Sequence, residues 1–557
     1  MSNHERAIAH QYHQSTKLFY LDFPRKPLAY KRYRALPRLP LPVEVAPLAV
    51  PALETVATSV PAASAAQAMD LATLAGLLFY SAGLIRKRTF AGAGEVAFRA
   101  AASAGGLYPI ETYVVCGDLP GLAAGVYHFS PADFALRCLR QGDYRSALAR
   151  AAAGDPTVAS AAGTLVFSAI FWRSAWKYRS RSYRYCFWDN GTIVANLLAA
   201  ATAAGLPARV LMGFVDAQAN HLLGLDGHRE ASTCLVSLGQ PAALLPPATV
   251  SAAGAHVKAP PFPASATAEG RQLNVAPSLA AEPEPVPPLS VETEPSTVEE
   301  LDYPEMARLH TASTLTTAEE VVAWRESLAS MAEPSAEPHV PLRPLELAMV
   351  AMSTLGEVIR QRGSTRRFAR QPMSFSQLSA ILAHATTGVP ADFLSPDGTS
   401  LLDVYLIAHA VADLPSGSYV LTPQAQALQL LKTGDFREEA GHLCFEQALG
   451  ADASVVVFFM ADLEGVLQHF GNRGYRTVQF EAGILGGKMY LCAGALRLGA
   501  SGLTFYDDDV TAFFAPHATG KSAIFVVALG QTAPENRVRP FRSRVGMRLD
   551  ALSRRDA

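Results

Sequence analysis

Two short segments, far apart in the chain, carry side chains suited to binding an anion and a flat ring. In the first, RGSTRRF, Arg362, Ser364 and Arg366 stand at every second position. In an extended or turning backbone their two guanidinium groups would point to one side with a hydroxyl between them. Such a fork suits the bidentate hydrogen bonds that a phosphate accepts. A solvated basic turn before a helix would account for the same residues.

The second segment is SAGGLYP, residues 103–109. Its small residues would let the backbone approach a flat ligand closely, and its hydroxyl and backbone N–H groups could bind one. A tight loop before the strand-like run IETYVV is the alternative explanation. Each segment predicts part of a site, and neither half of the chain contains both.

The chain is long enough for two domains. Its 557 residues exceed what one ordinary core accommodates, and half of them are hydrophobic. Between residues 244 and 296 the sequence becomes rich in Pro, Ala and Glu and too poor in large apolar residues to pack. We therefore expect an N-terminal extension (1–60), a first domain (61–243), a linker with a helical bracing segment (244–340) and a second domain (341–545).

The two domains are related by duplication. Adding 292 to a residue number carries a set of residues in the first domain onto identical residues in the second, without a gap. The matched pairs are Gly125 and Gly417, Tyr127 and Tyr419, Pro131 and Pro423, Gly142 and Gly434, Asp143 and Asp435, Arg145 and Arg437, Arg181 and Arg473, Tyr183 and Tyr475, Arg184 and Arg476, and Gly191 and Gly483. In each half β-branched strands alternate with Ala- and Leu-rich helices. We therefore expect two tandem α+β sandwich domains, each with helices around a central mixed sheet.

The composition excludes several kinds of function. The 47 basic and 49 acidic residues nearly cancel, which argues against a nucleic-acid-binding surface and favours a small molecule or a peptide as ligand. The six cysteines are scattered, with no CxxC pair and no histidine cluster at metal spacing, so we expect buried, reduced thiols and no metal site. The polar N-terminus lacks a signal-peptide core and no apolar run is long enough to span a membrane. These features predict a soluble cytoplasmic protein.

Both segments resemble motifs of one family. RGSTRRF is similar to the RxSxR flavin-phosphate motif of the nitroreductase superfamily. FRAAASAGGLYPIETYVV is similar to a segment that marks its SagB/ThcOx-type branch, the azoline-oxidising peptide dehydrogenases. Nitroreductase-like proteins usually work as dimers with FMN at the interface. There the RxSxR motif of one subunit holds the phosphate, and the segment equivalent to SAGGLYP comes from the other.

The resemblance implies one composite flavin site. The first half has no arginine where RxSxR should stand, in LETVATSVPAASAAQ, and the second half has SPDGTSL in place of SAGGLYP. We therefore expect an intramolecular pseudo-dimer in which the two domains share one FMN site, while the mirror-image site is degenerate or empty. The FMN-binding residues that the resemblance implies are Arg362, Ser364, Arg366, Ser103, Ala104, Gly105, Leu107 and Pro109, then Gly502, Leu503 and Thr504 of the loop GASGLTF, and Arg539 or Arg537, for which a solvated tail is an equal explanation.

Lys177 and Tyr178 match the Lys-Tyr pair that azoline dehydrogenases use beside the flavin. Forming an aromatic azole removes a proton from carbon while a hydride leaves, so a base is needed beside the flavin. A lysine desolvated among aromatic side chains could be that base, with Tyr178 as a proton relay. The aromatic residues expected around it are Trp172, Trp176 and Tyr183. A surface lysine packing on these rings is the alternative.

The mirror position in the second half has His469 and Phe470, which predicts a single active site. Residues that recur in both halves are expected to be structural, namely Arg181, Tyr183 and Arg184 with their partners. Asp189 and Asn196 could reach the domain interface, or the sequence WDNGT could serve as a helix cap.

The resemblance thus implies an FMN-dependent dehydrogenase that oxidises thiazoline or oxazoline rings in a ribosomally made peptide. Expected partners are a peptide or small-molecule substrate and other peptide-modifying enzymes, without nucleic acid or membrane, and whole chains could form further oligomers. Two alternatives stay open: an NAD(P)H-dependent reductase of nitro compounds or quinones, and a pseudo-enzyme that acts as a scaffold in a peptide-modifying complex.

Overall fold

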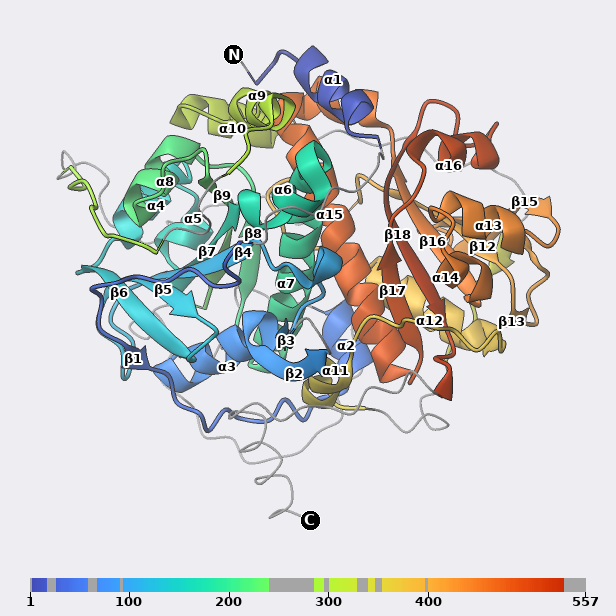
Figure 1. Cartoon of the computed structure of the whole chain (residues 1–557), viewed down its shortest axis with the longest axis horizontal. Coiled ribbons are helices and arrows are strands. Elements are labelled where there is room, and N and C mark those ends of the chain that lie inside the picture. Colours follow the sequence, from blue (N-terminus) through green and yellow to red (C-terminus); the bar gives the residue numbers. More distant parts are fainter. Residues whose placement is uncertain are drawn as a thin grey trace, which may run out of the picture.

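Two halves, each built around a β-sheet, lie on either side of two long central helices (Figure 1). The first half of the chain, in blue and green, forms one side, and the second half, in orange and red, forms the other. The computed structural model describes residues 3–17, 27–58, 68–90, 94–239, 285–294, 300–327, 339–345, 353–395 and 399–534.

The first sheet has seven strands: β1 (Leu39–Pro40), β4 (Ile110–Cys116), β5 (Gly125–Ser130), β6 (Ala135–Gln141), β7 (Gly163–Ile170), β8 (Ala208–Leu211) and β9 (Glu230–Leu238). Their order in space is β1-β6-β5-β4-β7-β9-β8. The second sheet also has seven: β10 (His339–Pro341), β12 (Asp403–Ala408), β14 (Gly417–Thr422), β15 (Ala427–Thr433), β16 (Val455–Ala461), β17 (Gly499–Leu503) and β18 (Ser522–Gly530). Their order, β10-β15-β14-β12-β16-β18-β17, is the same topology.

The duplication read from the sequence is therefore structural. Strands β14, β15 and β18 begin 292 residues after β5, β6 and β9, at 417, 427 and 522 against 125, 135 and 230. The expected mixed sheet is wrong, because every pairing within these two sheets of the described chain is antiparallel. Strands β7 and β8, which a long helix connects, do run parallel, but β9 lies between them.

Two small sheets complete the strands: β2 (Leu84–Phe90) with β3 (Gly94–Arg99), and β11 (Met373–Ser374) with β13 (Val411–Ala412). The two central helices are α7 (Ser182–Ala203) and α15 (Leu463–Ala495). The other helices are α1 (Ala7–Ser15), α2 (Ala52–Ala57), α3 (Leu71–Ala82), α4 (Arg145–Ala151), α5 (Pro156–Ala159), α6 (Trp172–Tyr178), α8 (Asp216–Leu223), α9 (Pro304–Ala312), α10 (Ala318–Glu326), α11 (Leu355–Gln361), α12 (Phe375–Ala385), α13 (Arg437–Leu443), α14 (Ala448–Asp452) and α16 (Asp507–Phe514), with short 3-10 turns η1 (Ala104–Gly106) and η2 (Arg179–Arg181).

The central helices cross at a pair of symmetry-related glycines. A Cβ atom on Gly191 of α7 would stand 2.4 Å from the carbonyl oxygen of Phe480, and one on Gly483 of α15 would stand 2.4 Å from that of Trp188. Both distances are far below van der Waals contact, so only glycine lets the two backbones approach this closely. The recurrence of glycine at these two positions is thus explained by helix packing between the domains.

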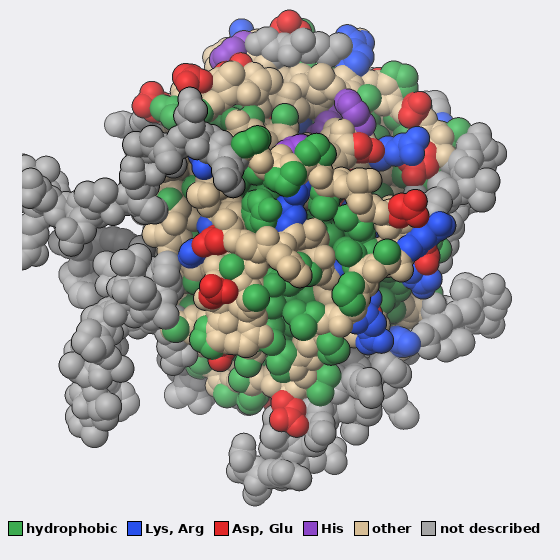
Figure 2. Space-filling view, turned by 90° about the vertical axis from the view of Figure 1, so that its left-hand side faces the viewer, with side chains coloured by type: hydrophobic (Ala, Val, Ile, Leu, Met, Phe, Trp, Pro, Cys, Tyr) green, Lys and Arg blue, Asp and Glu red, His purple; other side chains and the backbone are tan. Residues whose placement is uncertain are grey.

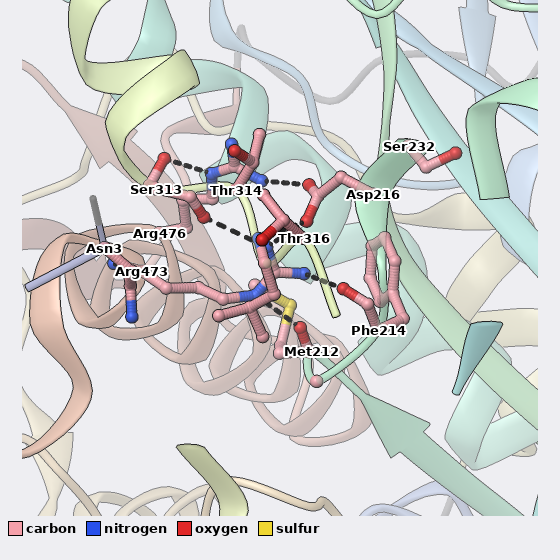
Figure 3. Close-up of polar contacts among 12 residues, drawn as sticks. Asn3, Met212, Phe214, Asp216, Ser232, Ser313, Thr314, Thr316, Arg473 and Arg476 are labelled. Carbon is pink, nitrogen blue, oxygen red and sulfur yellow. Dashed lines mark hydrogen bonds and ion pairs between the residues drawn. The ribbon is translucent and has the colours of Figure 1, made fainter. Parts of the chain in front are cut away.

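Two buried ion-pair clusters join the domains reciprocally. Arg473 and Arg476 of α15 donate to the carboxylate of Asp216 on α8, at 2.6 and 2.8 Å (Figure 3). Arg184 on α7 and Arg181, just before that helix, bind Asp507 of α16 in the same way, at 2.5 and 2.8 Å. These contacts agree with the structural role expected for the arginines that recur in both halves.

Helices α9 and α10, which precede the second domain in the sequence, contact both domains. The guanidinium of Arg476 donates to the carbonyl oxygen of His310 on α9 at 2.6 Å. On α10, the indole N–H of Trp324 donates to the carbonyl oxygen of Phe470 at 3.1 Å. Arg325 donates to Asp392 of the second domain at 3.1 Å and to the carbonyl oxygen of Gly213 in the first at 2.6 Å.

The surface and core show few special features. On the face in Figure 2, charged side chains of both signs are scattered between apolar ones. No helix in the described ranges is long and apolar enough to cross a membrane. All six cysteines are free thiols, and Cys138 is only half-buried, unlike the other five.

Candidate functional site

A cavity of about 620 Å³ lies between the two domains. This volume falls in the range of about 300 to 1,000 Å³ that small-molecule and cofactor sites occupy. The first domain contributes Arg86, Val96, Phe98, Arg99, Ala101 to Gly106, Tyr108, Lys177, Tyr178, Tyr185, Trp188, Asp189 and Thr192, and the second contributes Arg362, Gly363, Ser364, Arg366, Gln447, Tyr490, Gly502, Leu503, Thr504 and Phe525.

The RGSTR segment enters the cavity directly from the end of α11. This helix begins with a capping box between Thr354 and Glu357, and the backbone N–H of Arg362 closes its last turn. The chain then runs beside β17, where the backbone N–H of Thr365 donates to the carbonyl oxygen of Ala500 at 2.8 Å. The edge of the second sheet thereby fixes the segment in place.

Arg362 reaches across the domain interface. Its guanidinium donates to the carbonyl oxygen of Ala100, just before the SAGGLYP loop, at 2.9 Å from Nε. Burial lowers the pKa of this arginine. The contact links the RGSTR segment of the second domain to the backbone just before the SAGGLYP loop of the first.

Tyr490 links RGSTR to the loop after β17. Its hydroxyl lies 3.0 Å from the Ser364 hydroxyl and accepts a hydrogen bond from the backbone N–H of Gly502 at 2.6 Å. Nothing in the sequence pattern pointed to this tyrosine, because it lies near the end of a long helix in which most residues are buried.

Asp189 of α7 holds the SAGGLYP loop. Its carboxylate accepts from the Ser103 hydroxyl at 2.5 Å and from the backbone N–H of Ala104 at 2.8 Å. Burial raises the pKa of Asp189 to about 7. Leu107 and Pro109 do not line the cavity, and the carbonyl oxygen of Pro109 instead accepts from the backbone N–H of Ile170 at 2.9 Å.

Lys177 and Tyr178 at the end of α6 meet the loop at Gly105. An ideal Cβ on Gly105 would stand 2.5 Å from the Tyr178 hydroxyl and 2.9 Å from the Lys177 amine. Burial lowers the pKa of Lys177, and the positive charge of Arg366 lowers it further, whereas burial raises the pKa of Tyr178. None of the three aromatic residues expected around Lys177, Trp172, Trp176 and Tyr183, lines the cavity. The Tyr183 hydroxyl instead lies near His310 and Ser313.

The charges of the cavity suit an anion. Its lining holds five cationic side chains and one carboxylate. In the described part of the chain, the side chains of Lys177 and Arg366 make no hydrogen bond or ion pair with another residue. Because unpaired cations facing one cavity repel each other, a bound phosphate would stabilise them.

The apolar lining suits a flat ring. The rings of Tyr185 and Trp188 lie 4.6 Å apart with an interplanar angle of 32°, and Trp188 lies 5.1 Å from Phe525. Cationic side chains that suit a phosphate and aromatic side chains that suit a flat ring line the same cavity, so the residues present fit flavin mononucleotide.

Most of the predicted site residues therefore meet in one cavity. Arg537 and Arg539 lie outside the described residues, as do parts of the segments LETVATSVPAASAAQ and SPDGTSL. The sequence reasoning missed the cavity-lining residues Arg86, Tyr185, Trp188, Gln447 and Tyr490. Asp189, which the sequence analysis placed as a residue that could reach the domain interface, does line the cavity, and the offset of 292 pairs it with another acidic residue, Glu481.

Among the described residues, the mirror position lacks a comparable cavity and the Lys-Tyr pair. Leu198, which the offset pairs with Tyr490, lines a second cavity of only about 10 Å³, the size of about one water molecule. Lys488 also lines this small cavity, and its amine donates to the carbonyl oxygen of Thr387 at 2.7 Å. His469 is exposed, and Phe470 is buried 5.3 Å from Trp324 of the bracing helix α10.

These features define a duplicated α+β fold with a large cavity between its copies, and the comparison with known families agrees. The profile described as the nitroreductase family matches residues 57–240 and 359–530, more than half of the chain. The protein therefore belongs to the nitroreductase family and contains its domain twice.

Individual relatives match one domain or both. The crystal structure of a nitroreductase from Anabaena variabilis shares the fold over 94% of this chain and 99% of its own, with a TM-score of 0.70 and 24% identity. The nitroreductase MJ1384 of Methanocaldococcus jannaschii is 28% identical over 172 residues, which are 30% of this chain and 86% of MJ1384.

Two further relatives carry names that refer to processing. The microcin B17-processing protein McbC of Escherichia coli is 32% identical over 133 residues, 22% of this chain and 47% of McbC. The trifolitoxin-processing protein TfxB of Rhizobium leguminosarum bv. trifolii is 32% identical over 169 residues, 29% of this chain and 45% of TfxB. The chain thus spans less than half the length of each of these two relatives.

Proposed function

We propose that the protein is an FMN-dependent dehydrogenase that oxidises thiazoline or oxazoline rings in a peptide to azoles. The observation that carries this proposal is the position of Lys177 and Tyr178 on the wall of a cation-rich cavity, against Gly105 and near Arg366 of the other domain. Membership of the nitroreductase family supports a flavin-dependent redox reaction. The names of McbC and TfxB support a peptide as substrate.

In this proposal both domains hold the cofactor. Arg362, Ser364 and Arg366 would bind the phosphate of FMN, and the backbones of the SAGGLYP loop and of residues 502–504 would lie against the ring system. When bound, FMN supplies the acceptor for the hydride that leaves the substrate. Asp189 keeps the loop in the conformation that forms this wall.

The protein's own part in the chemistry is proton transfer. The Lys177 amine, whose pKa is lowered by burial and by the charge of Arg366, would take the proton from the azoline ring carbon. The Tyr178 hydroxyl, whose pKa is raised, stays protonated at neutral pH and would relay that proton from the amine toward solvent. The substrate then loses one proton and one hydride, which makes its ring aromatic.

A second candidate function is the reduction of nitro compounds or quinones with NAD(P)H, which the similarity to the nitroreductase MJ1384 favours. One experiment separates the two. The purified protein is first checked for a flavin spectrum and then assayed with a synthetic thiazoline peptide and, in parallel, with NAD(P)H plus a nitroaromatic or a quinone. We expect the peptide to lose two hydrogens, as measured by mass spectrometry. Turnover of NAD(P)H with an unchanged peptide would reject the dehydrogenase, and absence of flavin would favour a scaffold.

A further inference from the structure

The hairpin of β2 and β3 makes the cavity asymmetric. In the second domain the chain passes from α12 to β12 through residues 386–402, and its described residues form no strand there. Arg86, Val96 and Phe98 of the hairpin line the cavity. The hairpin therefore adds side chains to one of the two symmetry-related positions, the one that also has RGSTR and SAGGLYP.

Arg86 crosses from this hairpin to the RGSTR segment. Its guanidinium lies 4.9 Å from the centroid of the Phe98 ring, its partner across the hairpin. An ideal Cβ on Gly363 would stand 2.7 and 3.2 Å from the two terminal nitrogens of Arg86. The side chain, only 8% exposed, is thus held against the backbone between Arg362 and Ser364.

The position of Arg86 adds a positive charge to a cavity that already holds several. Arg86, Arg362 and Arg366 all line it, and the charge of Arg86 adds to burial in lowering the pKa of Arg362. Guanidinium groups remain charged in proteins, so neither side chain relieves the repulsion by losing a proton. An anion that binds both Arg86 and Arg362 would offset their repulsion. Planar guanidinium groups are well suited to phosphate.

We propose that Arg86 is a further anion-binding residue of the cavity, which completes the phosphate site from the domain that lacks RGSTR. The inference rests on the proposed FMN function and deepens it, because the phosphate would be held from both domains rather than by the RGSTR segment alone. Gly363 leaves room for the Arg86 guanidinium, since any side chain at that position would displace it.

The test compares FMN with riboflavin, which lacks the phosphate. The full-length chain is freed of flavin and titrated with each compound, followed by flavin fluorescence, as wild type, Arg86→Gln, Arg86→Lys and Lys87→Gln. Lys87→Gln is the matched control, because this substitution removes the same charge from the next position of β2. Lys87 does not line the cavity. We expect Arg86→Gln to weaken FMN binding by about 10- to 100-fold and to leave riboflavin binding unchanged, with Arg86→Lys in between. Lys87→Gln should change neither.

Riboflavin binding also reports whether each variant keeps its fold. Equal weakening of FMN and riboflavin in Arg86→Gln would overturn the inference, since it would place Arg86 at the ring or in the fold alone. Unchanged FMN affinity would overturn it as well. A wild-type chain that binds neither flavin would instead reject the proposed FMN function on which the inference rests.

Discussion

Gly105 is the residue of the SAGGLYP loop that contacts the Lys-Tyr pair, Lys177 and Tyr178. The Lys177 amine and the Tyr178 hydroxyl occupy the space that a side chain at position 105 would need. Its neighbour Gly106 has almost the same φ, 65° against 62°, but no neighbouring heavy atom lies within 4 Å of an ideal Cβ there. The loop thus offers its own control for separating backbone strain from steric displacement.

We predict that Gly105→Ala lowers azoline oxidation by about 10- to 100-fold, because the new methyl group pushes the reacting groups aside. Gly106→Ala carries the same cost of about 1 kcal/mol for a positive φ and should retain most of the activity. Initial rates on a synthetic thiazoline peptide, with flavin content measured for each variant, check this. Similar losses in both variants would show that backbone strain, and not displacement of Lys177 and Tyr178, is the cause.

Binding and chemistry should separate at the residue scale. Replacing both Arg362 and Arg366 by Ala removes charge-assisted hydrogen bonds of roughly 1.5 to 3 kcal/mol each and should release the flavin. Lys177→Ala should keep the flavin and lose turnover, because the amine is proposed to move a proton and not to hold the cofactor. Absorbance spectra and rates of the purified variants test both statements. Full activity of the lysine variant would mean that another group is the base.

At the scale of elements, each long central helix carries a buried carboxylate that holds the loop before the sheet. Glu481 of α15 accepts from the Ser400 hydroxyl at 2.7 Å and from the backbone N–H of Leu401 at 3.1 Å, as Asp189 of α7 does for Ser103 and Ala104. Burial raises the pKa of Glu481 to about 7, and these bonds and the charge of Lys488 offset burial only in part. Hydrogen bonding from the loop to a helix carboxylate is therefore part of the duplicated fold. In the first domain it also shapes a wall of the 620 Å³ cavity.

This raised pKa predicts a pH dependence of stability. Between about pH 4.5 and 7 an unfolded chain loses the Glu481 proton while the folded chain keeps it, so the free energy of unfolding falls as pH rises through this window. Glu481→Gln cannot titrate. Relative to wild type, we expect its free energy of unfolding to rise by roughly 1 to 3 kcal/mol between pH 5 and pH 8. Denaturant or thermal unfolding at the two pH values measures this, and a difference that does not change with pH would contradict it.

The sequence predicts the elements better than it predicts the site. The offset of 292 holds for strand boundaries because a duplicated core conserves where β5, β6 and β9 recur as β14, β15 and β18. Arg86 and Tyr490 could not be found in this way, because neither lies in a recognisable motif. Packing of one domain on the other brings Arg86 to Gly363, and the fold of the second domain brings Tyr490 to Ser364 and Gly502. The mixed sheet was wrong because the alternation of strands and helices does not reveal that β9 is inserted between β7 and β8.

At the scale of the whole molecule, the two domains are joined by buried charge as well as by apolar packing. Asp216 and Asp507 each bind two arginines of the other domain, and all of these side chains are buried. Removing one partner of a buried pair leaves an uncompensated charge, which costs about 3 to 5 kcal/mol. Because both clusters and both walls of the cavity lie within one chain, the pseudo-dimer should not need a second chain to complete the cavity.

The last prediction tests whether the flavin site is shared. Because the cations of RGSTR and the SAGGLYP loop belong to different domains, we expect about one FMN per chain, measured by absorbance after denaturation. Cutting the chain near Ala264 gives fragments 1–264 and 265–557, which keep α9 and α10 with the second domain. Neither fragment alone should hold FMN, and mixing them should restore binding.

Asp216→Asn should weaken this reassembly, because Arg473 and Arg476 then lose their buried counter-charge. A substitution at the exposed Asp413, Asp413→Asn, is the matched control, since its ion pair with Arg343 lies at the surface and within one domain. Firm binding of FMN by either isolated fragment, or two tightly bound flavins per intact chain, would show that the site is not shared between the domains.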